Sequence, residues 1–164
     1  MRRVLPLLAA LTLSACGLQP LYGGGSGSTV ATTLRAVEVA PIDSTVGWLV
    51  HNKLMERLGP GGGPPLYRLE VELDDDITGF GIRGDRAVTR ERRTLRARYR
   101  LVNLQSGGVV LDATAGSDAG IDVVSSEYAT VAAEQSAVER LSEVLAEQIV
   151  ARLGLFAART APAK

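Results

Sequence analysis

Apolar and polar residues alternate along much of this chain with the period of a β-strand. The clearest case is the stretch 66–76, in which Tyr67, Leu69 and Val71 share one face and charged residues share the other. This pattern is typical of a strand with one buried face. Three further segments are β-prone and bounded by turn residues, which predicts strands over 34–40, 87–104 and 109–121.

Two other stretches follow the period of a helix. Ser44 is a suitable N-cap for a helix that runs to Leu58 and ends before Gly59. A second helix is predicted to start near Ser125 or Ser126 and to end at Gly154. Its apolar residues recur three and four positions apart, at Val138, Leu141, Leu145, Ile149 and Leu153.

These elements predict a single domain over 34–154, ordered strand, helix, three strands, helix. The expected fold class is α+β, a two-layer sandwich with two helices packed on one face of a four-stranded, mostly antiparallel sheet. The Gly-rich segment 77–86 is interpreted as a loop or an irregular hairpin. Residues 16–33 are expected to form a lipidated N-terminus and flexible tether, and 155–164 a flexible tail.

The first fifteen residues have the pattern of a secretory signal peptide. A basic start is followed by ten apolar residues, Val4–Leu13, which as a helix would be about 15 Å long and too short to span a bilayer. Leu13-Ser14-Ala15-Cys16 then resembles the lipobox of bacterial lipoproteins, which predicts that Cys16 carries the acyl chains of a membrane anchor. The alternative is an ordinary secretory peptide with a chance cysteine at its cleavage region.

Composition excludes several classes of function. Formal charge is zero over 164 residues, and removal of Arg2 and Arg3 with a leader would leave −2, so the charge balance indicates no nucleic-acid partner. One cysteine cannot form an internal disulfide, and one histidine, His51, excludes the usual Cys/His zinc sets. We predict no cofactor, no metal site and no catalytic residues.

The strongest local feature is a row of arginines within 86–100. In an extended strand they share one face over about 33 Å, at Arg90, Arg92, Arg96, Arg98 and Arg100. Such a row suits phosphate or carboxylate groups. The alternative, which composition alone favours, is that these arginines pair across the sheet with Glu70, Glu72 and Asp74 and keep an exposed face soluble.

Weaker candidates have structural explanations that we favour. The triplet Asp74–Asp76 could bind a divalent cation, but a solvated strand end is the better interpretation. The tripeptide Arg83-Gly84-Asp85 lies in a Gly-rich turn and recurs by chance. His51 is expected on a helix surface or half-buried, and the sequence does not decide whether Trp48 is a core residue or a contact anchor.

Several of these segments together resemble a known family. The start "CGLQPLYG" (16–23), the Gly/Ser stretch after it, the strand–helix opening and "SSEYATVAAEQSAVERL" (125–141) resemble the LPS-assembly lipoproteins (LptE), particularly those of alphaproteobacteria. The resemblance covers essentially the whole mature chain in element order. It implies the same two-layer sandwich and no catalytic activity.

The resemblance also implies partners. Members of that family sit as a plug inside a large outer-membrane β-barrel, the LPS-assembly protein, assist its folding and help to deliver lipopolysaccharide to the outer leaflet. They are reported to bind lipopolysaccharide, so the arginine row becomes a candidate lipopolysaccharide- or barrel-contacting surface. Gly17 after the lipidated Cys16 implies the outer membrane, with the body on the periplasmic side within the barrel lumen.

Two other functions would share a lipoprotein anchor. An envelope enzyme such as a peptidoglycan hydrolase would need a carboxylate or nucleophile with a partner at working distance in a cleft, and the sequence offers no such pairing. An accessory lipoprotein of another envelope transport system would share the anchor and the size. Only the identity of its partner would separate it from the plug.

Overall fold

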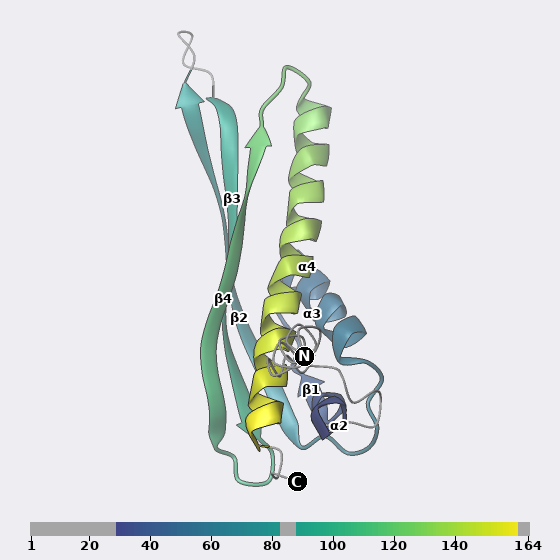
Figure 1. Cartoon of the computed structure of the whole chain (residues 1–164). Coiled ribbons are helices and arrows are strands. Elements are labelled where there is room, and N and C mark those ends of the chain that lie inside the picture. The colour runs from purple at the N-terminus through teal and green to yellow at the C-terminus, as the bar shows by residue number, and fades with distance from the viewer. Residues whose placement is uncertain (1–28, 83–87, 161–164) are drawn as a thin grey trace, which may run out of the picture.

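In a computed structural model, residues 29–82 and 88–160 are described, and they form three helices and one sheet (Figure 1). The elements in chain order are α2 (Thr29–Arg35), β1 (Val37–Val39), α3 (Thr45–Leu58), β2 (Tyr67–Ile82), β3 (Val88–Asn103), β4 (Val109–Asp122) and α4 (Glu127–Thr160). The expected signal peptide, Cys16 and the tripeptide 83–85 lie outside the described residues.

The sheet is mixed and open, and its strand order β1-β2-β3-β4 follows the chain. β1 runs parallel to β2, which requires a crossover connection, and α3 lies in that connection. The pairs β2–β3 and β3–β4 are antiparallel, with a register shift at Leu101/Val102. The predicted α+β fold with a four-stranded, mostly antiparallel sheet is therefore confirmed.

Helices α3 and α4 lie on the same side of the sheet (Figure 1). The 34 residues of α4 make a helix about 51 Å long, which runs alongside β3 and β4. The core lies between these layers and combines apolar residues of α3, β3 and α4, among them Val50, Leu54, Leu95, Tyr99, Leu101, Leu145 and Ile149. Burial of these side chains is the main force that holds the long helix on the sheet. None of the helices in the described ranges has both the length and the apolar run that crossing a membrane requires.

The first long helix begins and ends where its sequence predicts. The Ser44 side-chain oxygen accepts a hydrogen bond of 3.0 Å from the backbone N–H of Gly47, which satisfies one of the free donors of the first turn. At the other end Gly59 has φ 78°, and its N–H donates to the carbonyl of Met55.

Of the two alternatives for 77–86, the loop is wrong over 77–82, where the chain is part of an antiparallel pair of strands. β2 continues to Ile82, because residues 77–80 and 82 pair with residues 88–93 of β3. Gly79 lies opposite Glu91 in this ladder. Pairing with a neighbouring strand satisfies the backbone of a Gly-rich segment that has weak strand propensity of its own.

The chain is also helical where we expected a tether, a strand and a tail. Helix α2 begins at Thr29, and Leu34, expected at the start of a strand over 34–40, is a buried residue of this helix, so that β1 is reduced to Val37–Val39. α4 continues past Gly154 to Thr160. The ring of Phe156 packs edge-to-face on Tyr67, with centroids 5.9 Å apart, and Ala157 is buried, so tertiary packing stabilises these last turns.

Candidate functional site

The five arginines of β3 lie on the sheet face that points away from α3 and α4. Alternate residues of the same strand, Leu95, Ala97, Tyr99 and Leu101, are buried in the core, as the alternation predicted. We call the solvent-facing side of β2, β3 and β4 the arginine face. Burial on the core side also raises the pKa of the Tyr99 hydroxyl.

Acidic residues flank the arginines on both neighbouring strands. Across the ladder from β3, strand β2 places Glu70, Glu72, Asp74 and Asp76 on the arginine face. Strand β4 places Asp112, Asp118 and Asp122 there. The arginine face is therefore a central basic column between two acidic columns, and acids outnumber these arginines on the three strands.

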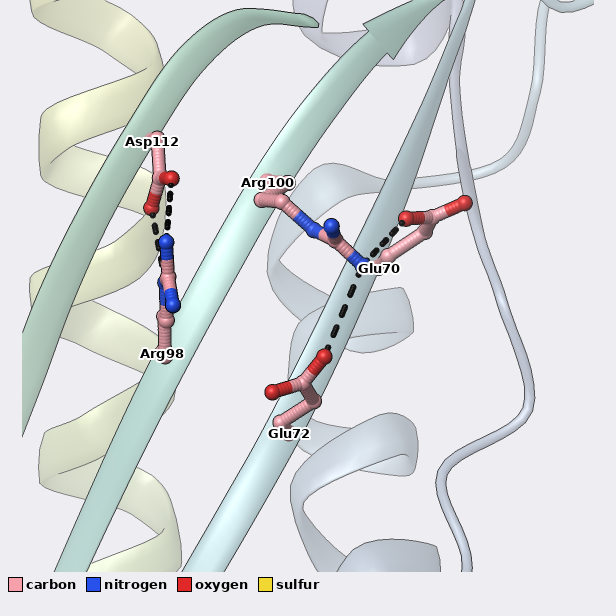
Figure 2. A network of polar contacts seen from close by, with 5 residues as sticks. All are labelled: Glu70, Glu72, Arg98, Arg100 and Asp112. Carbon is pink, nitrogen blue, oxygen red and sulfur yellow. Dashed lines mark hydrogen bonds and ion pairs between the residues drawn. The ribbon is translucent and has the colours of Figure 1, made fainter.

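Two arginines in the C-terminal part of β3, the central of the three long strands, hold carboxylates from opposite sides (Figure 2). Arg98 binds Asp112 of β4 through two bonds, Nε to Oδ1 at 3.2 Å and Nη2 to Oδ2 at 2.9 Å. Arg100 reaches the other way, and its Nη2 lies 3.3 Å from Glu70 and 3.5 Å from Glu72 on β2. The bonds from Arg98 lower the pKa of Asp112 and raise that of Arg98.

Two further arginines lie toward the end of the sheet where α4 begins. Arg90 Nε donates to Asp122 at 3.1 Å. The guanidinium of Arg92 lies over the ring of Phe80, 5.5 Å from its centroid, in cation–π geometry. The expected pairing with acids of β2 thus occurs for Arg100, whereas Arg90 and Arg98 pair with β4.

Arg96 differs from the other four arginines. Its neighbours across the sheet are Asp74 on β2 and Gly116 on β4. Within residues 29–82 and 88–160, neither Arg96 nor Asp74 has an oppositely charged group at ion-pairing distance. A Cβ atom at Gly116 would lie 2.5 Å from Cδ of Arg96, so this arginine occupies the space that a side chain at 116 would fill.

Arg96 lines an open hollow of about 780 Å³ that extends across β2, β3 and β4 on the arginine face. Its lining also includes Asp74, Arg98 and Thr114, together with Gln148 of α4. The side-chain amide of Gln148 bonds both backbone groups of Gly116, accepting from its N–H at 3.1 Å and donating to its carbonyl at 3.3 Å. A helix residue therefore covers part of the exposed edge of β4, where a further strand would otherwise pair.

The aspartate triplet does not form a cation site. Asp75 points to the helix side, opposite to Asp74 and Asp76, and binds Arg93 through two bonds of 2.6 and 2.8 Å. These bonds raise the pKa of Arg93 above its ordinary value. In the part of the chain that the structure describes, no cluster of three or more His, Cys, Asp or Glu side chains could hold a metal ion.

The structure also places the two remaining candidates on α3. His51 is half-buried, as predicted. The side chain of Trp48, which the sequence left undecided, is 61% exposed and is not part of the core.

Sequence reasoning missed the β4 aspartates and Gln148. The hairpin turn after β3 carried a signal for the first set, because a tight turn sets the register that brings Asp112 beside Arg98 and Arg100. Nothing local in the sequence indicates that Gln148 reaches Gly116, since 32 residues separate them.

Comparison with solved structures supports the fold. A lipoprotein from Caulobacter crescentus CB15 matches with a TM-score of 0.69 and 24% identity, over 83% of this chain and 100% of that chain. A minor lipoprotein from Acinetobacter baumannii matches with 0.59 and 13%, over 74% and 92% of the two chains. The rare lipoprotein B from Shewanella oneidensis matches with 0.53 and 9%, over 76% and 94%.

Comparison with curated protein sequences found no match. The family comparison is more specific, because the model of LptE, described as lipopolysaccharide-assembly, matches residues 34–153. That range includes α3, the whole described sheet and most of α4. The chain therefore belongs to the LptE family, with a role in lipopolysaccharide assembly.

Proposed function

We propose that this protein is an outer-membrane lipoprotein, anchored through acyl chains on Cys16, that plugs the β-barrel LPS-assembly protein. In this role it assists the assembly of that barrel and helps to deliver lipopolysaccharide to the outer leaflet, acting by contact and without catalysis. Membership of the lipopolysaccharide-assembly family supports the general role. The observation that carries the finer proposal is the arginine face, on which acidic and basic side chains are interspersed along a long, narrow body (Figure 1).

The mixed acidic and basic side chains of the arginine face suit contact with the polar inner wall of a β-barrel. Three of its five arginines are already paired with carboxylates, and acidic columns lie on both sides. The interior of a large outer-membrane barrel is lined by polar side chains and water, so such a face can dock there without entering lipid. A surface that bound lipopolysaccharide phosphates along its whole length would instead carry a surplus of unpaired basic groups.

The dimensions also suit a lumen. β2 and β3 have 16 residues each, which corresponds to about 53 Å. The apolar band of an outer-membrane barrel is about 25 Å tall. A body of this length would fill the lumen along its axis and extend into the periplasm. The acyl chains on Cys16 would then enter the periplasmic leaflet of the outer membrane.

The proposal is tested by capture of the tagged, lipidated protein from detergent-solubilised outer membrane, followed by mass spectrometry. A roughly stoichiometric large β-barrel is the expected partner. Cys16→Ala removes the acyl acceptor, so mass spectrometry of the captured protein should find acyl chains on wild type and none at position 16 of the variant, while the barrel is captured with both. If the wild-type protein came down with transporter subunits of the inner membrane, or alone, the plug would be refuted. Transporter subunits would support the accessory-lipoprotein alternative.

A further inference from the structure

Docking of the arginine face removes it from water, and the arginines enter such an interface with different partners. Arg98 and Arg100 carry their own carboxylates with them, and Arg90 carries Asp122. Arg92 keeps the aromatic face of Phe80. A charge that loses water without gaining a counter-charge is costly, whereas a pair that is already formed keeps its partner.

Arg96 and Asp74 bring no such partner. They lie directly across from one another on β3 and β2 and line the same hollow, yet neither forms an ion pair within the described ranges. The hollow of about 780 Å³ leaves room for side chains from another molecule beside both groups. Because Arg96 and Asp74 form no ion pair with one another in this conformation, both are available to pair with charged groups of that molecule.

The surroundings of Arg96 distinguish a protein partner from an anionic lipid. Asp74 lies opposite Arg96, and Asp76 and Asp118 lie one step farther along the face, on either side of Thr94. These carboxylates repel a phosphate group that approaches Arg96 from solvent. A protein wall can instead present a carboxylate to Arg96 and basic side chains to the aspartates, which satisfies both signs.

We infer that Arg96 and Asp74 are the residues of the arginine face that form ion pairs with the partner barrel. The wall of the barrel supplies a carboxylate to Arg96 and a basic side chain to Asp74. This inference rests on the proposed function, since it names the residues through which the plug meets the barrel. The other four arginines of the face maintain the sheet and its solubility.

The test is a charge swap that preserves composition. Asp74→Arg with Arg96→Asp keeps the net charge and one acidic and one basic residue at these opposed positions, but exchanges which strand carries which charge. The matched control is Arg90→Asp with Asp122→Arg, which reverses an ion pair of the arginine face that is already formed within the chain. Both full-length, lipidated variants are compared with wild type in the capture assay. Their thermal unfolding is measured by circular dichroism.

We expect the Asp74/Arg96 swap to reduce captured barrel on the order of 10- to 100-fold, as for a lost interfacial charge contact. The control swap should retain wild-type capture. Arg96→Gln is measured in parallel, so that the inference stays testable if the swap unfolds the body, and it too should weaken capture.

Other results separate the two proposals. If wild type captures the barrel and both the Asp74/Arg96 swap and Arg96→Gln do so equally well, this inference is overturned while the proposed function stands. If wild type captures no barrel, both fall. If the variants lose binding to purified lipopolysaccharide but keep the barrel, Arg96 is a glycolipid contact and the inference is again overturned.

Discussion

Two adjacent aspartates of β2 should differ sharply in their contribution to stability. Asp75 faces α4 and forms a two-bond ion pair with Arg93, whose side chain is only 12% exposed, while the side chain of Asp75 is 24% exposed. Arg93 also donates to the backbone carbonyl of Glu134 at 3.4 Å. One guanidinium therefore connects β2, β3 and the N-terminal half of α4.

Replacement of Asp75 by Ala leaves this guanidinium poorly solvated and without its carboxylate. Removal of one partner from a fully buried pair costs about 3–5 kcal/mol. Because some solvent reaches this pair, we expect about 1–3 kcal/mol for Asp75→Ala, or a lowering of Tm by about 3–10 °C. Asp74→Ala is the matched control, since its exposed side chain has no ion pair in the described ranges, and it should change stability by less than about 0.5 kcal/mol.

The assay is thermal and urea unfolding of both variants at pH 7, followed by circular dichroism. A double-mutant cycle with Arg93→Met isolates the coupling between the two side chains, which should be about 0.5–3 kcal/mol. Equal Tm values for Asp75→Ala and Asp74→Ala, or a coupling energy near zero, would show that the ion pair does not hold α4 on the sheet.

Three further outcomes follow from packing and charge. Gly47→Ala should lower the free energy of unfolding by about 1–3 kcal/mol, because the new Cβ would lie 2.6 Å from the backbone oxygen of Ile42. This clash outweighs the higher helix propensity of Ala, and an unchanged Tm would contradict it. Leu145→Ala, at a fully buried position of α4, should cost about 2–5 kcal/mol in urea unfolding, and a loss below 1 kcal/mol would mean that the site is not packed. The Arg98 pair lowers the pKa of Asp112 in the folded state, so its contribution is present above the unfolded value of about 4 and is lost as pH falls through the lowered folded-state pKa. Asp112→Asn should therefore flatten the loss of stability in acid, and an acid-unfolding profile identical to wild type would argue against the pair.

Local pattern was sufficient for the elements whose stability depends on nearby residues. The cap at Ser44, the stop at Gly59 and the alternation of β3 are all properties of a few neighbouring residues, and the structure confirms each of them. The candidate arginines were likewise found by a period of two, which places them together on any extended strand. Signal peptide and lipidation at Cys16 also depend on local sequence and remain predictions.

Elements that depend on distant residues could not be found in this way. β2 beyond residue 76 exists because β3 pairs with it, and the last turns of α4 beyond Gly154 are held by contacts such as Phe156 with Tyr67. Helix α2 appears within an expected tether because Leu34 enters the core. In each case tertiary contacts outweigh weak local propensity.

The amino-acid sequence by itself determined the fold class, the two long helices and the presence of an arginine row on one sheet face. Only the tertiary structure decided which arginines are already neutralised, because that depends on the register of β4 and on where each side chain finds a carboxylate. It also set Arg96 and Asp74 apart, since both line a hollow and neither forms an ion pair within the described residues. The sequence alone gives the charged residues of one strand. Which of them form ion pairs depends on the register of all three strands, because the partners lie on the neighbouring strands.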